Sequence, residues 1–459
     1  MSKRTSGVVA ALALACVMLM PPRGVFATNF ADVTPSPQQV RWEDLEFGVI
    51  VHFGPNTFMD REWGDGTASP AVFTPAALDP DQWVQAAKAA GARYLVMVAK
   101  HHDGFCLWPS DQTDYSVRSS PWKNGKGDVV GEVAAAARKQ GLPFGVYLSP
   151  WDRHDPRYAD SKTYDRYYES ELEELAQRYG ELVEFWLDGA GSEGHVYDFP
   201  RFIETLRTYQ PNTLVFADVG LFDYGDIRWV GNEEGVVRGE NWNVIDRHGT
   251  LRWRPAEVDT PLRRFHWFWH PNDERSLKTV AELMQTYENS VGRGGQLMLG
   301  IAPDRQGLLP QSDVVRLREF GDAIRKRYGD NLMKQHRPGS DPELERALDD
   351  DPDTFWSAPA GSHHATLEVK FDHPIQFDRA VTMEWLETGQ RVRQYRIEAW
   401  TGTEWKPVAQ AQAIGHKKID VFPAVTTNRV RLNLLSTTDA AQIREFALYN
   451  SQASATAPR

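Results

Sequence analysis

Short apolar runs alternate with amphipathic stretches from Leu45 to Pro310. Short β-branched and aromatic runs are typical of strands, whereas apolar residues three or four positions apart are typical of helices. The pattern predicts eight strands, at Glu46–Phe53, Arg93–Ala99, Pro143–Leu148, Leu182–Leu187, Thr213–Asp218, Asp226–Val230, Arg264–Trp269 and Gln296–Ile301. It predicts helices between most of them, at Pro80–Ala90, Val129–Lys139, Lys162–Tyr179, Phe199–Tyr209 and Leu277–Ser290. An α/β fold follows, a (β/α)8 TIM-like barrel that is irregular because its fifth to seventh strands lack clear connecting helices.

The periodicity changes after the turn-rich segment Arg337–Asp341. Alternating apolar and polar residues then predict strands without helices, at Ala365–Phe371, Ala380–Trp385, Gln394–Thr401, Lys417–Phe422, Arg429–Leu434 and Glu445–Tyr449. Such a series predicts an all-β sandwich. We therefore expect a barrel over residues 28–336, a sandwich over 341–451 and a disordered tail over 452–459.

Residues 1–27 have the pattern of a secretory signal peptide. Lys3 and Arg4 precede an apolar stretch from Val8 to Met20, and the small residue Ala27 ends the segment. The stretch is too short for a comfortable membrane span, and no later segment approaches that length. We expect an exported protein, periplasmic or secreted; lipoprotein anchoring through Cys16 is the alternative.

Charge and cysteine content narrow the class of protein. The formal net charge is −12, which disfavours a nucleic-acid partner because phosphate backbones are repelled. Of the two cysteines, only Cys106 stays after the signal peptide, so no internal disulfide is expected. The 16 Trp residues suit both large cores and the faces of sugar rings.

Polar and aromatic residues follow the predicted strands, at the rim where (β/α)8 barrels perform chemistry. Two of them are carboxylates, as retaining glycoside hydrolysis requires. Asp188 ends the apolar fourth strand and precedes Gly189 and Ala190, which leaves a short carboxylate with an open face. Glu233 follows the sixth strand within a Gly-rich turn, and its neighbour Glu234 would raise its pKa or take the acid role itself.

These residues also have purely structural interpretations. An Asp at a strand end is commonly a turn former, and an adjacent Glu pair is commonly a solvated face. His101 and His102 also suggest a metal, but consecutive residues of a strand face opposite sides, and no HExxH motif or Cys cluster accompanies them. We therefore expect no metal in the active site.

Several motifs, in this order, resemble glycoside hydrolase family 29, the retaining α-L-fucosidases, over about Glu43 to Leu309. They are Phe47-Gly48 with His52-Phe53-Gly54, Lys100-His101-His102-Asp103-Gly104-Phe105, Tyr147-Leu148-Ser149-Pro150, Trp186-Leu187-Asp188-Gly189 and the run Ser290 to Pro303.

The resemblance implies a role for each matched position. Asp188 is implied as the nucleophile, and His52, His101 and His102 as ligands of the fucose hydroxyls. Further sugar contacts are implied at Tyr147, Trp267, Trp63 and Arg228. No cofactor is implied.

The family's acid/base position varies. In the subgroup that prefers α-1,3- and α-1,4-linked fucose it resembles the Glu of Trp229-Val230-Gly231-Asn232-Glu233, and Trp267-Phe268-Trp269-His270 also resembles that subgroup. Gln296 and Gly300 depart from the family, because Asn is common at both positions.

The C-terminal run Asp349 to Trp356 resembles the opening of discoidin-like domains, which often serve as carbohydrate-binding modules. Its carboxylates suit calcium or a solvated turn equally well. Two roles are expected alternatives for this domain: it contacts glycans, or it has a structural role and packs against the barrel.

The sequence thus predicts an exo-acting α-L-fucosidase that releases terminal α-1,3/α-1,4-linked fucose from glycans with retention. The alternatives are a broad-specificity aryl, α-1,2- or α-1,6-fucosidase, a non-catalytic fucose-glycan-binding protein, and a metal-dependent barrel hydrolase.

Overall fold

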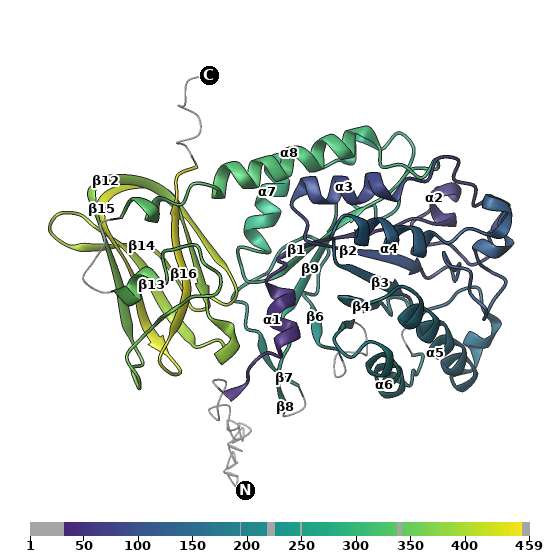
Figure 1. Ribbon diagram of the computed structural model, residues 1–459, viewed down its shortest axis with the longest axis horizontal. Coiled ribbons are helices and arrows are strands. Elements are labelled where there is room, and N and C mark those ends of the chain that lie inside the picture. Colours follow the sequence, from purple (N-terminus) through teal and green to yellow (C-terminus); the bar gives the residue numbers. More distant parts are fainter. Residues whose placement is uncertain (1–31, 193, 218–224, 248–249, 337–341, 452–459) are drawn as a thin grey trace, which may run out of the picture.

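The computed structural model describes residues 32–192, 194–217, 225–247, 250–336 and 342–451. Within these ranges a parallel barrel lies beside an antiparallel β-domain, and α8 (Gln311–Tyr328) runs along the barrel towards that domain (Figure 1). The predicted signal peptide with Cys16, the segment Arg337–Asp341 and the tail 452–459 lie outside the described residues. None of the helices in the described ranges is long and apolar enough to cross a bilayer.

The predicted barrel is confirmed: eight described strands close it in the order β1, β10, β9, β6, β5, β4, β3, β2. They are β1 (Phe47–Val51), β2 (Tyr94–Lys100), β3 (Phe144–Leu148), β4 (Glu184–Leu187), β5 (Leu214–Ala217), β6 (Ile227–Trp229), β9 (Ala256–Pro261) and β10 (Gln296–Ile301). Every residue of β1, β2 and β3 is buried, because a parallel barrel has side chains inside it and helices outside it.

The predicted seventh strand, Arg264–Trp269, is wrong. The strand is β9, and the predicted segment is part of the loop that follows it, in which Phe265 has φ 67°. Aromatic residues gave the loop a strand-like composition, whereas β9 carries Glu257 and Asp259, acidic types that are rare inside a barrel. Burial raises the pKa of Asp259 to about 8, so its carboxyl is accommodated uncharged at neutral pH.

The helices follow the prediction closely because each begins at a capping residue. They are α3 (Pro80–Ala90), α4 (Val129–Lys139), α5 (Ser161–Arg178), α6 (Phe199–Tyr209) and α7 (Val280–Asn289). The N-cap carboxylates of Asp79 and Asp128 accept backbone N–H groups, and Thr279 forms a capping box with Glu282. The sequence did not predict the short helices α1 (Pro37–Glu43), α2 (Pro55–Met59) and α9 (Pro342–Glu345), nor α8.

As expected, the described residues between β5 and β9 contain no helix. They contain instead a hairpin of β7 (Val244–Arg247) and β8 (Thr250–Trp253), which the sequence did not predict.

The C-terminal domain is the expected sandwich, with a six-stranded antiparallel sheet in the order β11, β16, β12, β15, β13, β14. Its strands are β11 (Trp356–Ser357), β12 (Ala365–Glu384), β13 (Val392–Trp400), β14 (Trp405–Ala411), β15 (Lys418–Thr437) and β16 (Gln442–Tyr449). Four predicted strands are halves of the long β12 and β15, which curve across the domain (Figure 1). The register of β12 on β15 shifts between Lys370 and Ile375, where the first of the predicted strands ends.

Candidate active site

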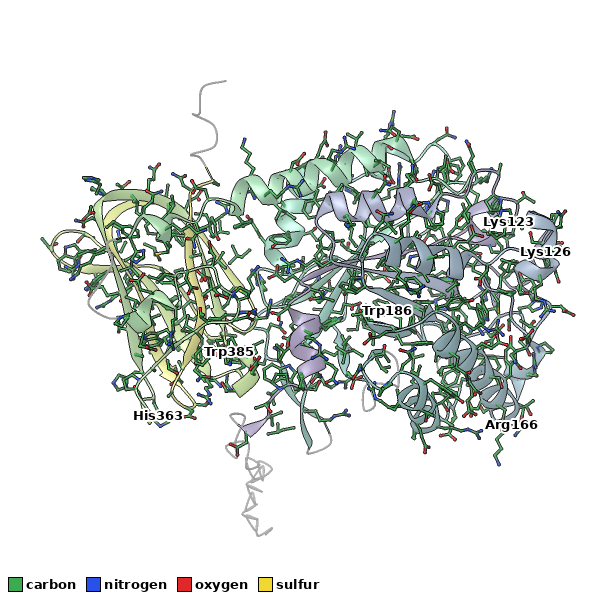
Figure 2. The ribbon with its side chains drawn as sticks, viewed as in Figure 1. Lys123, Lys126, Arg166, Trp186, His363 and Trp385 are labelled. Carbon is green, nitrogen blue, oxygen red and sulfur yellow. The ribbon has the colours of Figure 1, made fainter. Side chains whose placement is uncertain are left out.

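The ends of β1 to β4 place side chains on one rim of the barrel, since parallel strands all end on the same side. His52 directly follows β1, and His101 and His102 directly follow β2. Tyr147 lies in β3, and Asp188 directly follows β4. Inside the barrel below them, Trp186 of β4 stacks on Tyr147 with 5.9 Å between ring centroids (Figure 2).

The Asp188 carboxylate accepts one hydrogen bond from a side chain and one from the backbone. The Tyr147 hydroxyl donates to Oδ2 at 2.8 Å, and the backbone N–H of Ala190 donates to Oδ1 at 2.9 Å. The carboxylate side chain is 19% exposed, so it stays accessible from the rim. Both donors stabilise its ionised form and fix its direction.

His102 lies beside this carboxylate as a neutral ring. Its Nε2 is 3.8 Å from Asp188 Oδ2, and its Nδ1 is 2.8 Å from the Ser149 hydroxyl oxygen. Burial lowers the pKa of His102 to about 3, with further lowering from His52 and Arg153. With Nδ1 engaged by Ser149, the neutral ring leaves Nε2 to pair with a sugar hydroxyl.

His52 and His101 complete a group of three imidazoles. The His101 ring centroid lies 4.1 Å from that of His102 and 5.7 Å from that of His52. Burial, and then the neighbouring imidazole, lowers the pKa of both residues well below the usual range. Within the described chain, Nδ1 of each has no hydrogen-bond partner, and no group of three or more His, Cys, Asp or Glu residues has the geometry of a metal site.

Aromatic rings cover two sides of this group. The Trp267 ring lies 5.0 Å from that of His52. Trp63, 51% exposed, packs its edge on His102 at 5.4 Å and on Trp151 at 5.3 Å. An indole this exposed on the rim offers a face to a sugar ring. The sequence did not single out Trp151 as a site residue.

Glu233 reaches the same aromatic wall. Its Oε2 accepts a hydrogen bond of 3.2 Å from the Trp267 indole N–H. Although Glu233 is exposed, the protein atoms around its carboxyl raise its pKa by desolvation, and the charges of Asp188 and Glu62 raise it further; the indole N–H opposes them. The two carboxylates are thus linked through Tyr147, His52 and Trp267.

Two predicted residues lie outside this cluster. Glu234 is 63% exposed and forms a two-pronged ion pair with Arg238 at 2.7 Å, so it is turned to solvent. Arg228 donates to Asn241 Oδ1 at 2.5 Å and to the carbonyl of Arg254 at 3.2 Å, and burial lowers its pKa to about 10. Its hydrogen bonds hold protein segments together.

Glu62 is a site residue that the sequence did not reveal. Its carboxylate accepts the backbone N–H of Trp267 at 2.9 Å and of Phe268 at 3.2 Å, and contacts His270 Nε2 at 2.6 Å. It thereby fixes the loop that carries the Trp267 ring. The one signal in the sequence is its position next to Trp63.

Gly300, where the family commonly has Asn, gives the Trp267 ring its space. A Cβ at this position would lie 2.6 Å from the indole. The other departure, Gln296, donates to the carbonyl of Trp42 at 3.0 Å in the barrel core. Both departures have local structural roles.

A buried ion cluster supports the imidazoles from behind. Lys100 Nζ lies 2.5 Å from Glu171 Oε2 of α5 and 3.2 Å from Asp152 Oδ2, and all three side chains are inaccessible to solvent. Asp152 also accepts the backbone N–H groups of His154 and Asp155. Lys100 therefore ties the loop after β3 to α5, directly behind His101.

The site combines a carboxylate fixed by two hydrogen-bond donors, a carboxyl whose surroundings favour protonation, and neutral imidazoles. This is the division of labour needed to attack one side of a glycosidic carbon and protonate the leaving oxygen.

The chain is similar to several known proteins in sequence and in structure. The family described as alpha-L-fucosidase matches residues 56–329, and the F5/8 type C domain family matches residues 334–446. Alpha-L-fucosidase 1 of Arabidopsis thaliana is 35% identical over 426 residues, covering 86% of this chain and 83% of its own. The tissue alpha-L-fucosidase of Mus musculus is 28% identical over 64% of this chain and 70% of its own. A Ruminococcus gnavus fucosidase solved in complex with fucose has a TM-score of 0.84 and 28% identity, covering 92% of this chain and 96% of its own.

Replacing the buried cation tests the ion cluster. Lys100→Met leaves Asp152 and Glu171 buried without a counter-charge, which is expected to cost about 3–5 kcal/mol of unfolding free energy. Lys139→Met, which breaks an exposed pair with Asp81, is the control and should change stability little. Urea unfolding measures both. Equal losses in the two variants would contradict the account of the cluster.

Removing the indole N–H tests the electrostatics of Glu233. Trp267→Phe keeps an aromatic ring but removes the donor that stabilises ionised Glu233, so the pKa of Glu233 should rise. A general acid works while protonated, so the basic limb of the kcat/KM–pH profile should move to higher pH. Trp405→Phe in the sandwich is the control. A limb that stays or moves to lower pH would refute this role of the hydrogen bond.

Proposed function

The chain belongs to the α-L-fucosidase family of glycoside hydrolases, and from this premise we propose that it releases terminal fucose with retention, using Asp188 and Glu233. The α-L-fucosidase activity and a fucosylated glycan substrate follow from the family. The observation that supports the residue roles is the pair of unlike carboxylates linked across one aromatic wall.

The first step forms a fucosyl-enzyme. Asp188 attacks C1 of the fucose as the glycosidic C–O bond breaks, and Glu233 gives its proton to the departing oxygen. Tyr147 and Ala190 hold the attacking carboxylate, and the surroundings of Glu233 keep its proton in place until transfer. In the second step Glu233 takes a proton from water, the water oxygen bonds to C1, and Asp188 leaves.

The sugar itself is held by neutral imidazoles and aromatic faces. His52, His101 and His102 present ring nitrogens to hydroxyl groups without competing charge. The faces of Trp63 and Trp267 suit the C–H surface and the methyl group of a 6-deoxy sugar. No cofactor takes part in this mechanism.

We further propose a preference for α-1,3- and α-1,4-linked fucose. Its support is the segment Trp229 to Glu233 together with Trp267 to His270, which meet at the hydrogen bond between Glu233 and Trp267. A broad aryl, α-1,2- or α-1,6-fucosidase is the alternative.

The C-terminal domain and the leader complete the proposal. We propose glycan contact at Phe355 and Trp385, whose ring centroids lie 4.6 Å apart; Trp385 lies on the side of the sandwich nearer the barrel (Figure 2). In the acidic turn, Asp349 and Asp351 accept hydrogen bonds from the turn's own N–H and hydroxyl groups, as a solvated turn requires.

We also propose that the chain divides at residues 27, 336 and 451. We propose that the protein is exported, either to the periplasm or out of the cell.

Carboxylate variants test the residue roles. Asp188→Ala should lose nearly all hydrolysis of aryl α-L-fucosides. Glu233→Ala should lose on the order of 10²–10⁴-fold in kcat for weakly activated substrates, with partial rescue by azide. Glu234→Ala is the matched control and should stay near the parent enzyme. The first sugar released, followed by proton NMR, should be α-fucose. Near-normal turnover in Asp188→Ala, or β-fucose as first product, would sink the assignment.

A linkage panel tests the specificity. Lewis-type trisaccharides with α-1,3- or α-1,4-fucose should release fucose faster than 2-linked and 6-linked fucosides at equal concentration. Chromatography of free fucose measures the rates. Fastest release from 2-linked or 6-linked substrates would favour the broad-specificity alternative.

A further inference from the structure

The loop that carries Glu233 has no helix or strand of its own over residues 230–243. Its geometry therefore depends on the groups that anchor it. At its neck, Arg228 donates to Asn241 Oδ1 at 2.5 Å, and Asn241 Nδ2 donates to the carbonyl of Gly294 at 2.8 Å. These bonds close the loop against the segment that leads into β10.

The middle of the loop packs against the barrel. Gly235, with φ 74°, packs so closely that a Cβ would lie 2.7 Å from Thr286 and 2.9 Å from Thr260. The N–H of Val237 donates to the carbonyl of Asn289, the last residue of α7, at 2.9 Å. The loop tip extends beyond this contact, and its residue Glu233 accepts a hydrogen bond from Trp267.

The far end of the loop is held by the C-terminal domain. Gln390, 1% exposed, accepts the backbone N–H of Asn243 at 3.0 Å and donates to the carbonyl of Asn241 at 3.2 Å. The Glu240 carboxylate accepts the N–H groups of Gln412 and Ala413, between β14 and β15, at 3.2 and 3.1 Å.

The Arg393 guanidinium, 4.4 Å from the Trp242 ring centroid, extends the same contact. Two segments of the sandwich, at residues 390–393 and 412–413, thus contact the stretch from Glu240 to Asn243. Asn241, which lies within this stretch, is also the residue that bonds to Arg228 and Gly294.

We propose that the C-terminal domain positions the acid/base of the barrel, with Gln390 and Glu240 as positioning residues. The proposal rests on the role assigned above to Glu233. A general acid must lie within hydrogen-bond reach of the leaving oxygen, and small displacements reduce proton transfer steeply. Loosening the far end of an irregular loop lets its tip drift, whereas the nucleophile on β4 stays in place.

Leaving-group dependence separates this effect from general damage. A good leaving group departs without a proton, whereas a poor one needs the acid. We therefore measure kcat/KM for 4-nitrophenyl and phenyl α-L-fucosides with the full-length enzyme and with Gln390→Ala, Glu240→Ala and Arg444→Ala. Arg444→Ala is the matched control, because it breaks a different contact between the domains, the ion pair with Asp44 at 2.5 Å.

Gln390→Ala and Glu240→Ala should each lose roughly tenfold more kcat/KM on the phenyl than on the nitrophenyl substrate, a fraction of a full general-acid effect. Glu240→Gln, which keeps one acceptor oxygen, should fall between Glu240→Ala and the parent, and Arg444→Ala should show no such difference. Equal losses on both substrates, no loss, or the same difference in Arg444→Ala would overturn the proposal. Glu233→Gln is run alongside: if it shows no leaving-group dependence, the assignment of Glu233 fails instead.

Discussion

The hydrogen bond from the Tyr147 hydroxyl to Asp188 is the contact on which the rest of the site depends. It joins neighbouring strands β3 and β4 at the rim, and with the Ala190 N–H it fixes the direction of the carboxylate. The packing below serves this contact: Trp186 stacks on Tyr147, and the ion cluster of Lys100 holds the loop after β3. A carboxylate fixed this way suits the role of nucleophile proposed for it.

The carboxyl group of Glu233, on the other side of the site from Asp188, has surroundings that favour its protonated form. Glu233 comes from an irregular loop, and its pKa is raised by desolvation and by the charges of Asp188 and Glu62. Trp267 links the two halves of the site, because its ring meets His52 and its N–H meets Glu233. Gly300 leaves room for that ring, and Glu62 holds its backbone. One tryptophan thus depends on residues from two other segments of the chain.

Much of the barrel was predictable, because buried parallel strands are nearly continuous apolar runs and the helices begin at capping residues. The strand β9 was not, because burial inside the barrel raises the pKa of Glu257 and Asp259, and this is a property of surroundings formed only by folding. The rim residues on β1 to β4 were predictable from strand ends and motifs. Glu62 and the anchors of the Glu233 loop were not, because their partners lie far away in sequence, up to the C-terminal domain. Arg228 shows the converse, since its position beside the acid/base segment suggested a sugar contact that its hydrogen bonds do not support.

Covalent trapping identifies the residue that attacks the sugar. A 2-deoxy-2-fluoro-α-L-fucosyl fluoride slows both steps but leaves the first one possible, so the fucosyl-enzyme accumulates and its proteolytic peptides can be weighed and sequenced. The account predicts one added fluorofucosyl group, bonded to the side chain of Asp188. A label on Glu233, Glu62 or any other residue, or turnover of the reagent with no covalent label at all, would contradict it.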